Sequence, residues 1–317
     1  MAPLDDVTDT VFRRIVQSCA KPDLMFTEFT NVDALQSAGR KATLRRLDFT
    51  EAEKPIIAQI WGKTPENFYK TAKECLEKGF AGIDLNFGCP IKHVVKNGCC
   101  AALISNHQAA KDIIDATKQG VKAPKELQKM NDRSKSVTDV SISVKTRIGL
   151  KDFDNSWLEF LLRQKLDMLI IHLRTVREMS KVPAHWELMD KIKKMRDEIS
   201  PKTLLVANGD VQNRTQADFL AKKHRLDGVM IGRGVFSDPY AFAKKSPWPK
   251  MPAKKKIALY KKHVELFAST WENNERPIVT LNKFCKIYIN GFDGAKEMRE
   301  QLMACKSAEE LLGRLSA

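Results

Sequence analysis

Residues 84–90, with the sequence DLNFGCP, hold the most distinctive chemical groups of the chain. The side chains alternate as in a strand, and Pro90 lacks the N–H that a strand ladder needs, so we expect Cys89 where a strand ends and a loop begins. A thiol in that place can serve as a nucleophile, a redox partner, or a proton donor with a pKa near ~8.5. Packing in the core is the commoner fate of a single cysteine, so these residues alone leave the role of Cys89 open.

Polar, cationic and glycine residues also follow most of the other strand candidates. They are Ala2-Pro3-Leu4, Gln59 with Trp61-Gly62, Lys145-Thr146-Arg147, His172-Leu173-Arg174, Asn208-Gly209-Asp210 and Gly232-Arg233-Gly234. In a barrel of parallel strands the residues after each strand meet at one face, where barrel enzymes hold their active sites. The loops after the last two strands commonly bind phosphate through glycine N–H groups and a cation, a role that residues 208–209 and 232–233 fit. An ordinary tight turn at Gly209 and a surface ion pair at Arg233 are the alternatives.

The elements that must position these residues are short apolar runs alternating with amphipathic stretches. The predicted strands are Leu24–Thr27, Ile56–Ile60, Gly82–Leu85, Ser141–Lys145, Met168–His172, Leu204–Ala207 and Gly228–Ile231. The predicted helices are Thr8–Cys19, Pro65–Lys78, Gln108–Lys118, Asn155–Lys165, Trp186–Glu198 and Thr215–Lys223. Each strand and helix together take about 30 residues, as crossovers between parallel strands require.

This order of elements predicts a (β/α)8 TIM barrel. Seven strands can be counted, and an eighth would be the start of the chain, Met1–Pro3, which is too short for a full strand. A doubly wound sheet is the alternative, and it is weakened because no GxGxxG turn follows any strand candidate.

The pattern changes after Tyr240, where strand signals end. Three prolines mark a linker, and helical patterns follow at 257–271, 278–289, 295–305 and 308–315. We therefore expect a barrel domain over residues 1–243, a linker over 244–252 and a small helical bundle domain over 253–317. The polar, lysine-rich segment 119–138 is expected to be a loop insertion.

The charge of the chain suggests a polyanionic partner. The 54 lysines and arginines exceed the 39 acidic residues, which gives a net charge of +15. Residues 241–317 carry 15 of these cations against 8 acids, and no acid lies between Pro239 and Val264, where eight lysines occur. Nucleic acid is the favoured partner over a membrane surface, and a solvated basic face is the plainest alternative.

The cysteines and hydropathy indicate the compartment. None of the seven cysteines forms a CxxC pair, and there is neither a signal-peptide pattern nor an apolar run of about 18 residues. We therefore expect reduced thiols in a cytoplasmic protein without membrane contact. The six histidines are scattered, so no metal site is expected.

Taken in order, these strings resemble the tRNA-dihydrouridine synthase family. The resemblance is carried by Ala2-Pro3-Leu4, Val7-Thr8-Asp9 with Phe12-Arg13, Gln59, Asp84 to Pro90, Lys145-x-Arg147-x-Gly149, His172-x-Arg174-Thr175, Asn208-Gly209-Asp210 and Gly232-Arg233-Gly234. It is collinear from Met1 to Tyr240, and Lys283-Phe284-Cys285 with Tyr288 resembles the family's helical tRNA-binding domain.

The resemblance implies an FMN enzyme that reduces the uracil C5–C6 double bond in tRNA with NADPH or NADH. Cys89 would be the general acid, and Asn86, Arg147 and Arg174 would bind substrate. Flavin contacts would come from Ala2, Pro3, Leu4, Gln59, Lys145, His172, Asn208, Gly209, Asp210, Gly232 and Arg233. From the charge distribution we expect phosphate contacts from Lys254, Lys255, Lys256, Lys261 and Lys262, in a monomeric protein.

Three positions depart from the family pattern. The chain begins at Met1-Ala2-Pro3, where family members usually have several preceding residues that form the first strand, so we expect a curtailed first strand or an incomplete start. Leu4 replaces the usual Met, and Cys100 stands where Gly is common and forms a second candidate thiol.

Two other function classes remain open from the sequence. One is a flavin-dependent reductase of a free pyrimidine, similar to dihydroorotate or dihydropyrimidine dehydrogenases, which has no need of the basic C-terminal segment. The other is a non-catalytic tRNA-binding barrel, against which the intact Cys89, Lys145 and Arg233 argue.

Overall fold

The computed structural model describes residues 1–122, 140–272 and 275–316. The chain divides into two compact units. The first comprises Met1–Asp9, Asp23–Val211 and Gln216–Gly232, and the second comprises Thr10–Pro22, Gln212–Thr215 and Arg233–Ala317. Most of the predicted insertion 119–138 lies outside the described residues, and its first two residues close a helix, α6.

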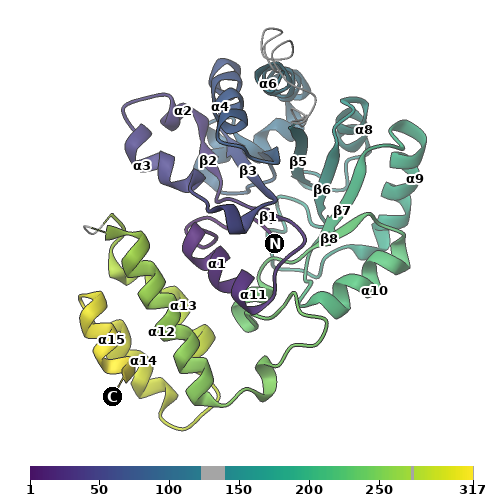
Figure 1. Ribbon diagram of the computed structural model, residues 1–317. Coiled ribbons are helices and arrows are strands. Elements are labelled where there is room, and N and C mark those ends of the chain that lie inside the picture. Colours follow the sequence, from purple (N-terminus) through teal and green to yellow (C-terminus); the bar gives the residue numbers. More distant parts are fainter. Residues whose placement is uncertain (123–139, 273–274, 317) are drawn as a thin grey trace, which may run out of the picture. The chain divides into compact units, whose positions relative to one another are not determined.

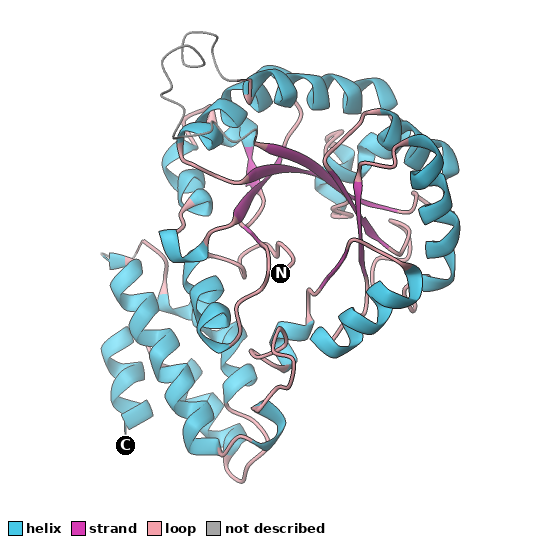
Figure 2. Cartoon of the chain, turned by 45° about the vertical axis from the view of Figure 1, so that its right-hand side comes forward, coloured by secondary structure: helices cyan, strands magenta, loops and turns pink. Residues whose placement is uncertain are grey.

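A sheet of parallel strands forms the centre of the first unit (Figure 1). Its strand order is β1-β3-β4-β5-β6-β7-β8, and β2 also pairs with β3. The strands are β1 (Met25–Phe26), β2 (Thr30–Asn31), β3 (Ile56–Trp61), β4 (Gly82–Phe87), β5 (Ser141–Arg147), β6 (Met168–His172), β7 (Leu204–Asn208) and β8 (Gly228–Met230). Figure 2 shows this sheet curling round, and the arrangement is consistent with a TIM barrel.

The eighth strand does not come from the start of the chain. Instead the predicted strand Leu24–Thr27 shortens to β1, and β2 follows it along the same edge of β3, with Met25 opposite Ile56 and Thr30 opposite Ile60. The start of the chain forms no strand in the described residues, but it lies between the two ends of the sheet. The Met1 ammonium donates to the Leu24 carbonyl at 2.7 Å, and the Ala2 N–H donates to the Ile231 carbonyl at 2.8 Å.

Helices follow the strands of the first unit and cover the outside of the sheet (Figures 1 and 2). The long helices are α4 (Pro65–Glu77), α6 (His107–Gly120), α8 (Asn155–Arg163), α9 (Met189–Ile199) and α10 (Arg214–His224). The sequence patterns predicted each of these to within a few residues. Shorter pieces were not predicted: α2 (Val32–Leu35), α3 (Arg40–Leu44), α5 (Lys92–Lys96) and single 3-10 turns, among them Cys100–Ser105.

Apolar residues of alternating strand positions fill the inside of the sheet. Phe26, Ile57, Ile170 and Met230 form one buried cluster, which Ala2 and Met168 join. Because side chains alternate between the two faces of a strand, residues two positions further along the same strands also point to this inner side. We call this shared alternation the inner parity of the strands. It determines which polar side chains point to the inner side of the sheet.

The second unit is helical. Its helices are α1 (Thr10–Cys19), α11 (Gly234–Ser237), α12 (Ala253–Thr270), α13 (Asn282–Tyr288), α14 (Ala295–Met303) and α15 (Ala308–Ser316). Phe12 of α1 stacks on Phe236, His263 and Phe284, with ring centroids 6.3, 5.8 and 4.7 Å away. This division differs from the predicted boundary at 243–253, because α1 and residues 233–243 belong with the C-terminal helices.

No helix of the described residues is long and apolar enough to cross a membrane.

Candidate active site

Five of the polar side chains singled out from the sequence share the inner parity of the strands. Gln59 follows Ile57 by two positions, His172 follows Ile170 and Asn208 follows Val206, and the cluster holds Ile57, Ile170 and Val206. In the sheet register Gln59 lies opposite Asp84, Asn86 opposite Lys145, and His172 opposite Asn208. The carboxyl ends of these strands therefore present one row of polar groups above an apolar core: Gln59, Asn86, Lys145, His172 and Asn208.

A buried hydrogen-bond network fixes one end of this row. The Gln59 amide donates to Asp84 at 2.6 Å, Asn86 donates to the Gln59 carbonyl oxygen at 3.1 Å, and Ser143 donates to the other Asp84 oxygen at 2.6 Å. Burial raises the pKa of Asp84 to about 6, although the bonds from Ser143 and Gln59 oppose the shift. The network sets the orientation of the Asn86 amide. Its member Ser143 lies in a predicted strand but was not among the predicted site residues.

Asn86 in turn holds the loop that carries the thiol. Its side-chain oxygen accepts hydrogen bonds from the Gly88 N–H at 3.2 Å and the Cys89 N–H at 3.0 Å. Side chains that accept from the backbone two or three residues ahead stabilise such turns. The spacing Asn-x-Gly-Cys therefore has a structural reason: the side-chain amide of a strand residue holds the turn that carries the cysteine.

The Cys89 thiol is partly exposed and acidic. A hydrogen bond from the Cys100 thiol is the largest cause that lowers the pKa of Cys89 to about 7; burial opposes it, and the Ile91 N–H adds to the lowering. Cys100 is 1% exposed, and burial raises its own pKa well above the ordinary value. Cys100 also has a backbone φ of 53°, in the left-handed region that favours glycine. Cys100 is therefore the donor to Cys89 rather than a second acid.

Lys145 presents a cation without a protein partner. Its ammonium makes no hydrogen bond or ion pair with the residues that the structure describes. Burial lowers the pKa of Lys145 to about 8, the charge of Arg147 acts in the same direction, and Asp84 and Cys89 oppose it. An unpaired ammonium on a half-buried side chain at the end of a strand is suited to an anionic ligand.

Arg147 and Arg174 were expected to bind substrate. In the structure, their guanidinium groups donate hydrogen bonds to carbonyls of the protein's own backbone. Arg147 donates to the carbonyls of Gly88, Thr175 and Met179, each at 2.9 Å. Arg174 is 2% exposed, donates to the Val182 carbonyl at 2.6 Å, and forms an ion pair with Asp210. In this structure both guanidinium groups therefore position loops around the site.

The residues after β7 and β8 form a narrow glycine-lined region. A Cβ on Gly209, whose φ is 142°, would lie 2.6 Å from the Ala184 Cβ. A Cβ on Gly232 would approach the Ala2 Cβ to 3.6 Å and the Asn208 amide nitrogen to 4.0 Å. The predicted residues Ala2, Asn208 and Gly232 thus come together, whereas Asp210 pairs with Arg174 and accepts from the Ala184 N–H at 2.9 Å.

Three further predicted flavin contacts are next to these residues in the chain: Pro3, Leu4 and Arg233. Pro3 and Leu4 continue from Ala2, and Leu4 is held by mutual hydrogen bonds with Thr8 at 2.9 and 3.1 Å. Arg233 begins the second unit directly after Gly232 and caps the four-residue helix α11.

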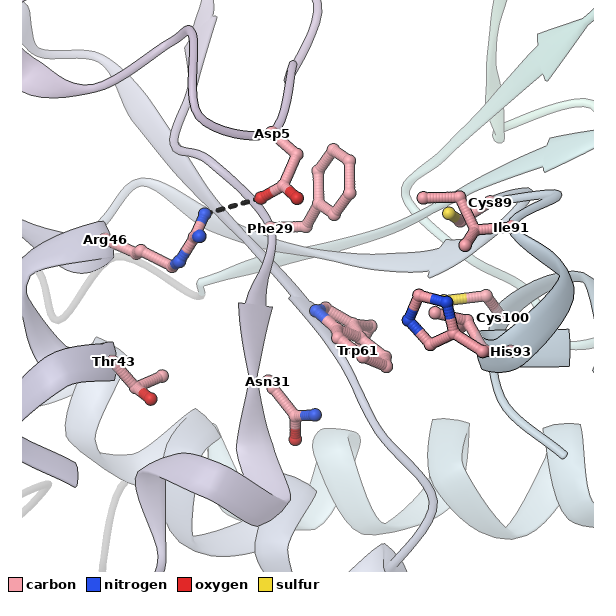
Figure 3. A pocket seen from close by; sticks show the side chains of 11 residues that line it. Asp5, Phe29, Asn31, Thr43, Arg46, Trp61, Cys89, Ile91, His93 and Cys100 are labelled. Atoms are coloured by element: carbon pink, nitrogen blue, oxygen red, sulfur yellow. Dashed lines mark hydrogen bonds and ion pairs between the residues drawn. The ribbon is translucent and has the colours of Figure 1, made fainter. Parts of the chain in front are cut away.

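A cavity of about 250 Å³ opens beside Cys89 (Figure 3). Its walls are Asp5, Phe29, Asn31, Thr43, Arg46, Trp61, Cys89, Ile91, His93, Val94 and Cys100. Arg46 pairs with Asp5 at 2.5 Å, Asp6 at 3.2 Å and Glu28 at 3.1 Å, so these three carboxylates balance its charge. Trp61 was noted in the sequence only as a residue after a strand, and Arg46 and His93 were missed because they lie in segments without a strand signal.

The predicted phosphate-contacting lysines lie on helix α12 of the second unit. Lys254, Lys255 and Lys262 are exposed and, at spacings of one, seven and eight residues, share one side of the helix. Lys256 and Lys261 are partly buried: the Lys256 ammonium lies 5.0 Å from the Trp248 ring centre, and Lys261 donates to Ser316 at 2.9 Å.

Comparison with known proteins decides the family. The model of the dihydrouridine synthase family matches residues 1–317. The chain belongs to the dihydrouridine synthase family. The resemblance carried by residues 84–90 and the other strand-end strings is thereby confirmed.

Curated relatives of the family match over nearly their whole length. The chain is 43% identical over 315 residues to "Probable tRNA-dihydrouridine synthase 2" of Bacillus subtilis (strain 168), with 98% of this chain and 90% of the relative covered. It is 42% identical over 313 residues to "Probable tRNA-dihydrouridine synthase" of Staphylococcus aureus (strain COL), with 98% and 89% covered. A solved 2-naphthoyl-CoA reductase complex shares the fold at a TM-score of 0.55 and 12% identity, over 76% of this chain and 48% of that chain.

Proposed function

We propose that this protein is a tRNA-dihydrouridine synthase, which reduces the C5–C6 double bond of uridines in tRNA. The observation that carries the proposal is the Cys89 thiol, whose pKa is lowered to about 7 on a loop held by Asn86 at the strand ends of a member of this family. Dihydrouridine differs from uridine by one hydride and one proton. A thiol that titrates near neutral pH is suited to deliver the proton.

The strand-end residues fit a flavin mononucleotide. The unpaired ammonium of Lys145 suits the negative charge of a reduced flavin ring, and the glycine-lined region around Asn208, Gly209 and Gly232 admits a phosphate close to the backbone. Gln59 and His172 lie in the same row of strand-end side chains as Lys145, and Arg233 follows Gly232 in the sequence. When bound and reduced by NADPH or NADH, the cofactor supplies the hydride that uracil C6 accepts.

The chain's own residues provide position and the proton. Asn86 uses one amide N–H on Gln59, so its second N–H remains for a uracil carbonyl. As hydride reaches C6, negative charge develops at C5 and the C4 carbonyl, and the Cys89 S–H gives its proton to C5. The sulfur is left as a thiolate, which the hydrogen bonds from Cys100 and the Ile91 N–H stabilise.

The second unit supplies the polyanion-binding surface in this proposal. Lys254, Lys255 and Lys262 on one side of α12 would contact tRNA phosphates, with Lys256 and Lys261 beside them. The unit would thus be the helical tRNA-binding domain of a (β/α)8 TIM-barrel enzyme.

The test compares tRNA with a free pyrimidine. Purified protein should be yellow from bound flavin, and NADPH oxidation should depend on unmodified tRNA. Turnover of free uracil or orotate that tRNA does not affect would favour a free-pyrimidine reductase. Tight tRNA binding by protein that takes up no flavin would favour a non-catalytic barrel.

A further inference from the structure

A second, wider cavity adjoins the cavity beside Cys89. The second cavity has a volume of about 600 Å³, within the ~300–1,000 Å³ range of small-ligand sites. The two cavities share the walls Asn31, Trp61, His93 and Val94. The two cavities therefore adjoin at these side chains, with Cys89 lining the first and the exposed Lys63 and Lys96 lining the second.

Trp61 is placed at the junction of the two cavities. It is the last residue of β3 and shares the inner parity of Ile57 and Gln59. Part of its ring packs against the buried cluster of Val94, Cys99 and Cys100, and the rest stays accessible. Its indole N–H makes no hydrogen bond with the described residues, so it is available to a ligand.

The outer cavity is bordered by cations. Lys63 and Lys96 line it, both are exposed, and neither ammonium pairs with a described residue. Asp33 is the one acidic group in its lining, and its carboxylate already accepts from the Lys63 N–H at 2.8 Å, the Thr64 N–H at 3.3 Å and the Asn67 amide at 2.8 Å. These bonds fix the turn that carries Lys63.

Proteins bind single-stranded nucleic acid with aromatic rings that have unpaired cations beside them. A base stacks on the ring, and a phosphate contacts the cations. The target uridine must lie against Cys89 and Asn86. The cavity space beside Trp61 is therefore available to the next nucleotide of the same strand. We propose that the two cavities form a subsite for a nucleotide adjacent to the target uridine, with its base against Trp61 and its phosphate near Lys63 and Lys96. This inference rests on the proposed function.

The subsite gives tRNA a contact that the α12 lysines cannot provide, because stacking is not a charge effect. Replacing an aromatic residue that stacks on a base weakens binding by about five- to a hundredfold. Trp61→Leu should therefore raise the Kd for tRNA by about that factor and leave the flavin content unchanged. Trp61→Phe should stay within about threefold of the wild type, because it keeps a ring. Lys63→Glu with Lys96→Glu should weaken binding too, whereas Lys73→Glu, on the outer helix α4 and away from both cavities, should not.

The decisive experiment removes one base from the RNA. Holoenzyme and its Trp61→Leu variant are titrated with tRNA that has an abasic nucleotide on one side or the other of the uridine that the wild type reduces. We expect that one of the two abasic tRNAs binds the wild type more weakly than intact tRNA does. The same abasic tRNA should bind the wild type and the Trp61→Leu variant with equal affinity. A Trp61→Leu Kd equal to the wild type's, or a loss of the same size on intact and both abasic tRNAs, would overturn it. If the wild type reduces no uridine at all, it is the proposed function that fails.

Discussion

One cysteine in each unit has a shifted pKa that sets it apart from the other, and the two shifts have opposite directions. In the first, the Cys100 hydrogen bond lowers the pKa of Cys89 to about 7. In the second, burial raises the pKa of Cys285 to about 11, although a hydrogen bond from Tyr260 opposes the shift. Both sulfurs accept a hydrogen bond, so the two cysteines differ in whether burial or hydrogen bonding has the larger effect on the thiol pKa.

The histidines and lysines repeat the contrast. Burial alone lowers the pKa of His263 to about 3, and its ring is satisfied by the Tyr288 hydroxyl at 3.0 Å. Lys145 is half-buried, but its pKa of about 8 and its lack of a protein partner leave it able to carry charge toward a ligand. His263 thus completes a core, whereas the Lys145 ammonium is available to another molecule.

The largest difference should come from exchanging the two thiols in turn for alanine. Cys89→Ala should lower dihydrouridine formation about 10²- to 10⁴-fold, because the proton donor is lost, while bound flavin remains. Cys285→Ala should keep the activity and lower stability by about 1 kcal/mol, because it removes only a buried sulfur. Rates from mass spectrometry of tRNA nucleosides and thermal unfolding curves measure the two effects. Equal activity of the two variants would abolish the distinction.

Lys145→Met should weaken FMN binding by about 10- to 100-fold, the worth of a hydrogen bond to a charged group. The Lys145 ammonium is charged below its pKa of about 8, so wild-type affinity should fall as pH rises through that value, and the variant should lack this fall. Lys151→Met, after the same strand but exposed, is the matched control. Fluorescence titration with FMN at several pH values measures both, and the same pH dependence in Lys145→Met would refute the assignment.

The exposed lysines of α12 should contribute a smaller effect that depends on salt. Replacing Lys254, Lys255 and Lys262 together with Gln should lower the slope of log affinity against log salt by about three and weaken tRNA binding about tenfold at physiological salt. The control makes the same charge change at Lys286 of α13, Lys296 of α14 and Lys306 between α14 and α15, which are all exposed. An unchanged slope in the α12 variant would show that this side of the helix does not meet phosphate.

The smallest expected change is a shift of the pH profile. The Cys89 thiol carries its proton below a pKa of about 7, so its acid role is lost as pH rises through that value. Cys100→Gly removes the largest cause of the lowered pKa and suits the backbone φ of 53°, so the falling limb should move to higher pH. Cys99→Ala, next to it in the chain, should leave the limb in place. A limb that stays fixed in Cys100→Gly would show that another group controls it.

The sequence predicted the strands and long helices well because each has a clear apolar period. It placed Gln59, Asn86, Lys145, His172 and Asn208 at strand ends, and the parity of the strands brings these residues to one side. It failed for β2, because a strand of two residues carries no period. It predicted the helix α1, at Thr8–Cys19, but assigned it to the barrel domain, because the contacts of its apolar side with residues far along the chain cannot be read from a local pattern.

Several roles needed coordinates because they depend on donors and acceptors. The sequence marks Arg147 and Arg174 as cations beside a site, but only the structure shows that their N–H groups hold backbone carbonyls. It marks Cys100 as a departure from the family pattern, but not as the hydrogen-bond donor to Cys89. Trp61 and His93 gain meaning only from the cavities that they line.

The measurement that tests the central claim most directly is the mapping of dihydrouridine in tRNA. The chain and its Cys89→Ala variant are expressed in a host that lacks dihydrouridine synthases of its own, and the tRNA is analysed position by position. We expect dihydrouridine at defined positions with the wild-type chain and almost none with the variant. Abundant flavin-loaded wild-type protein that leaves every uridine unreduced would contradict it.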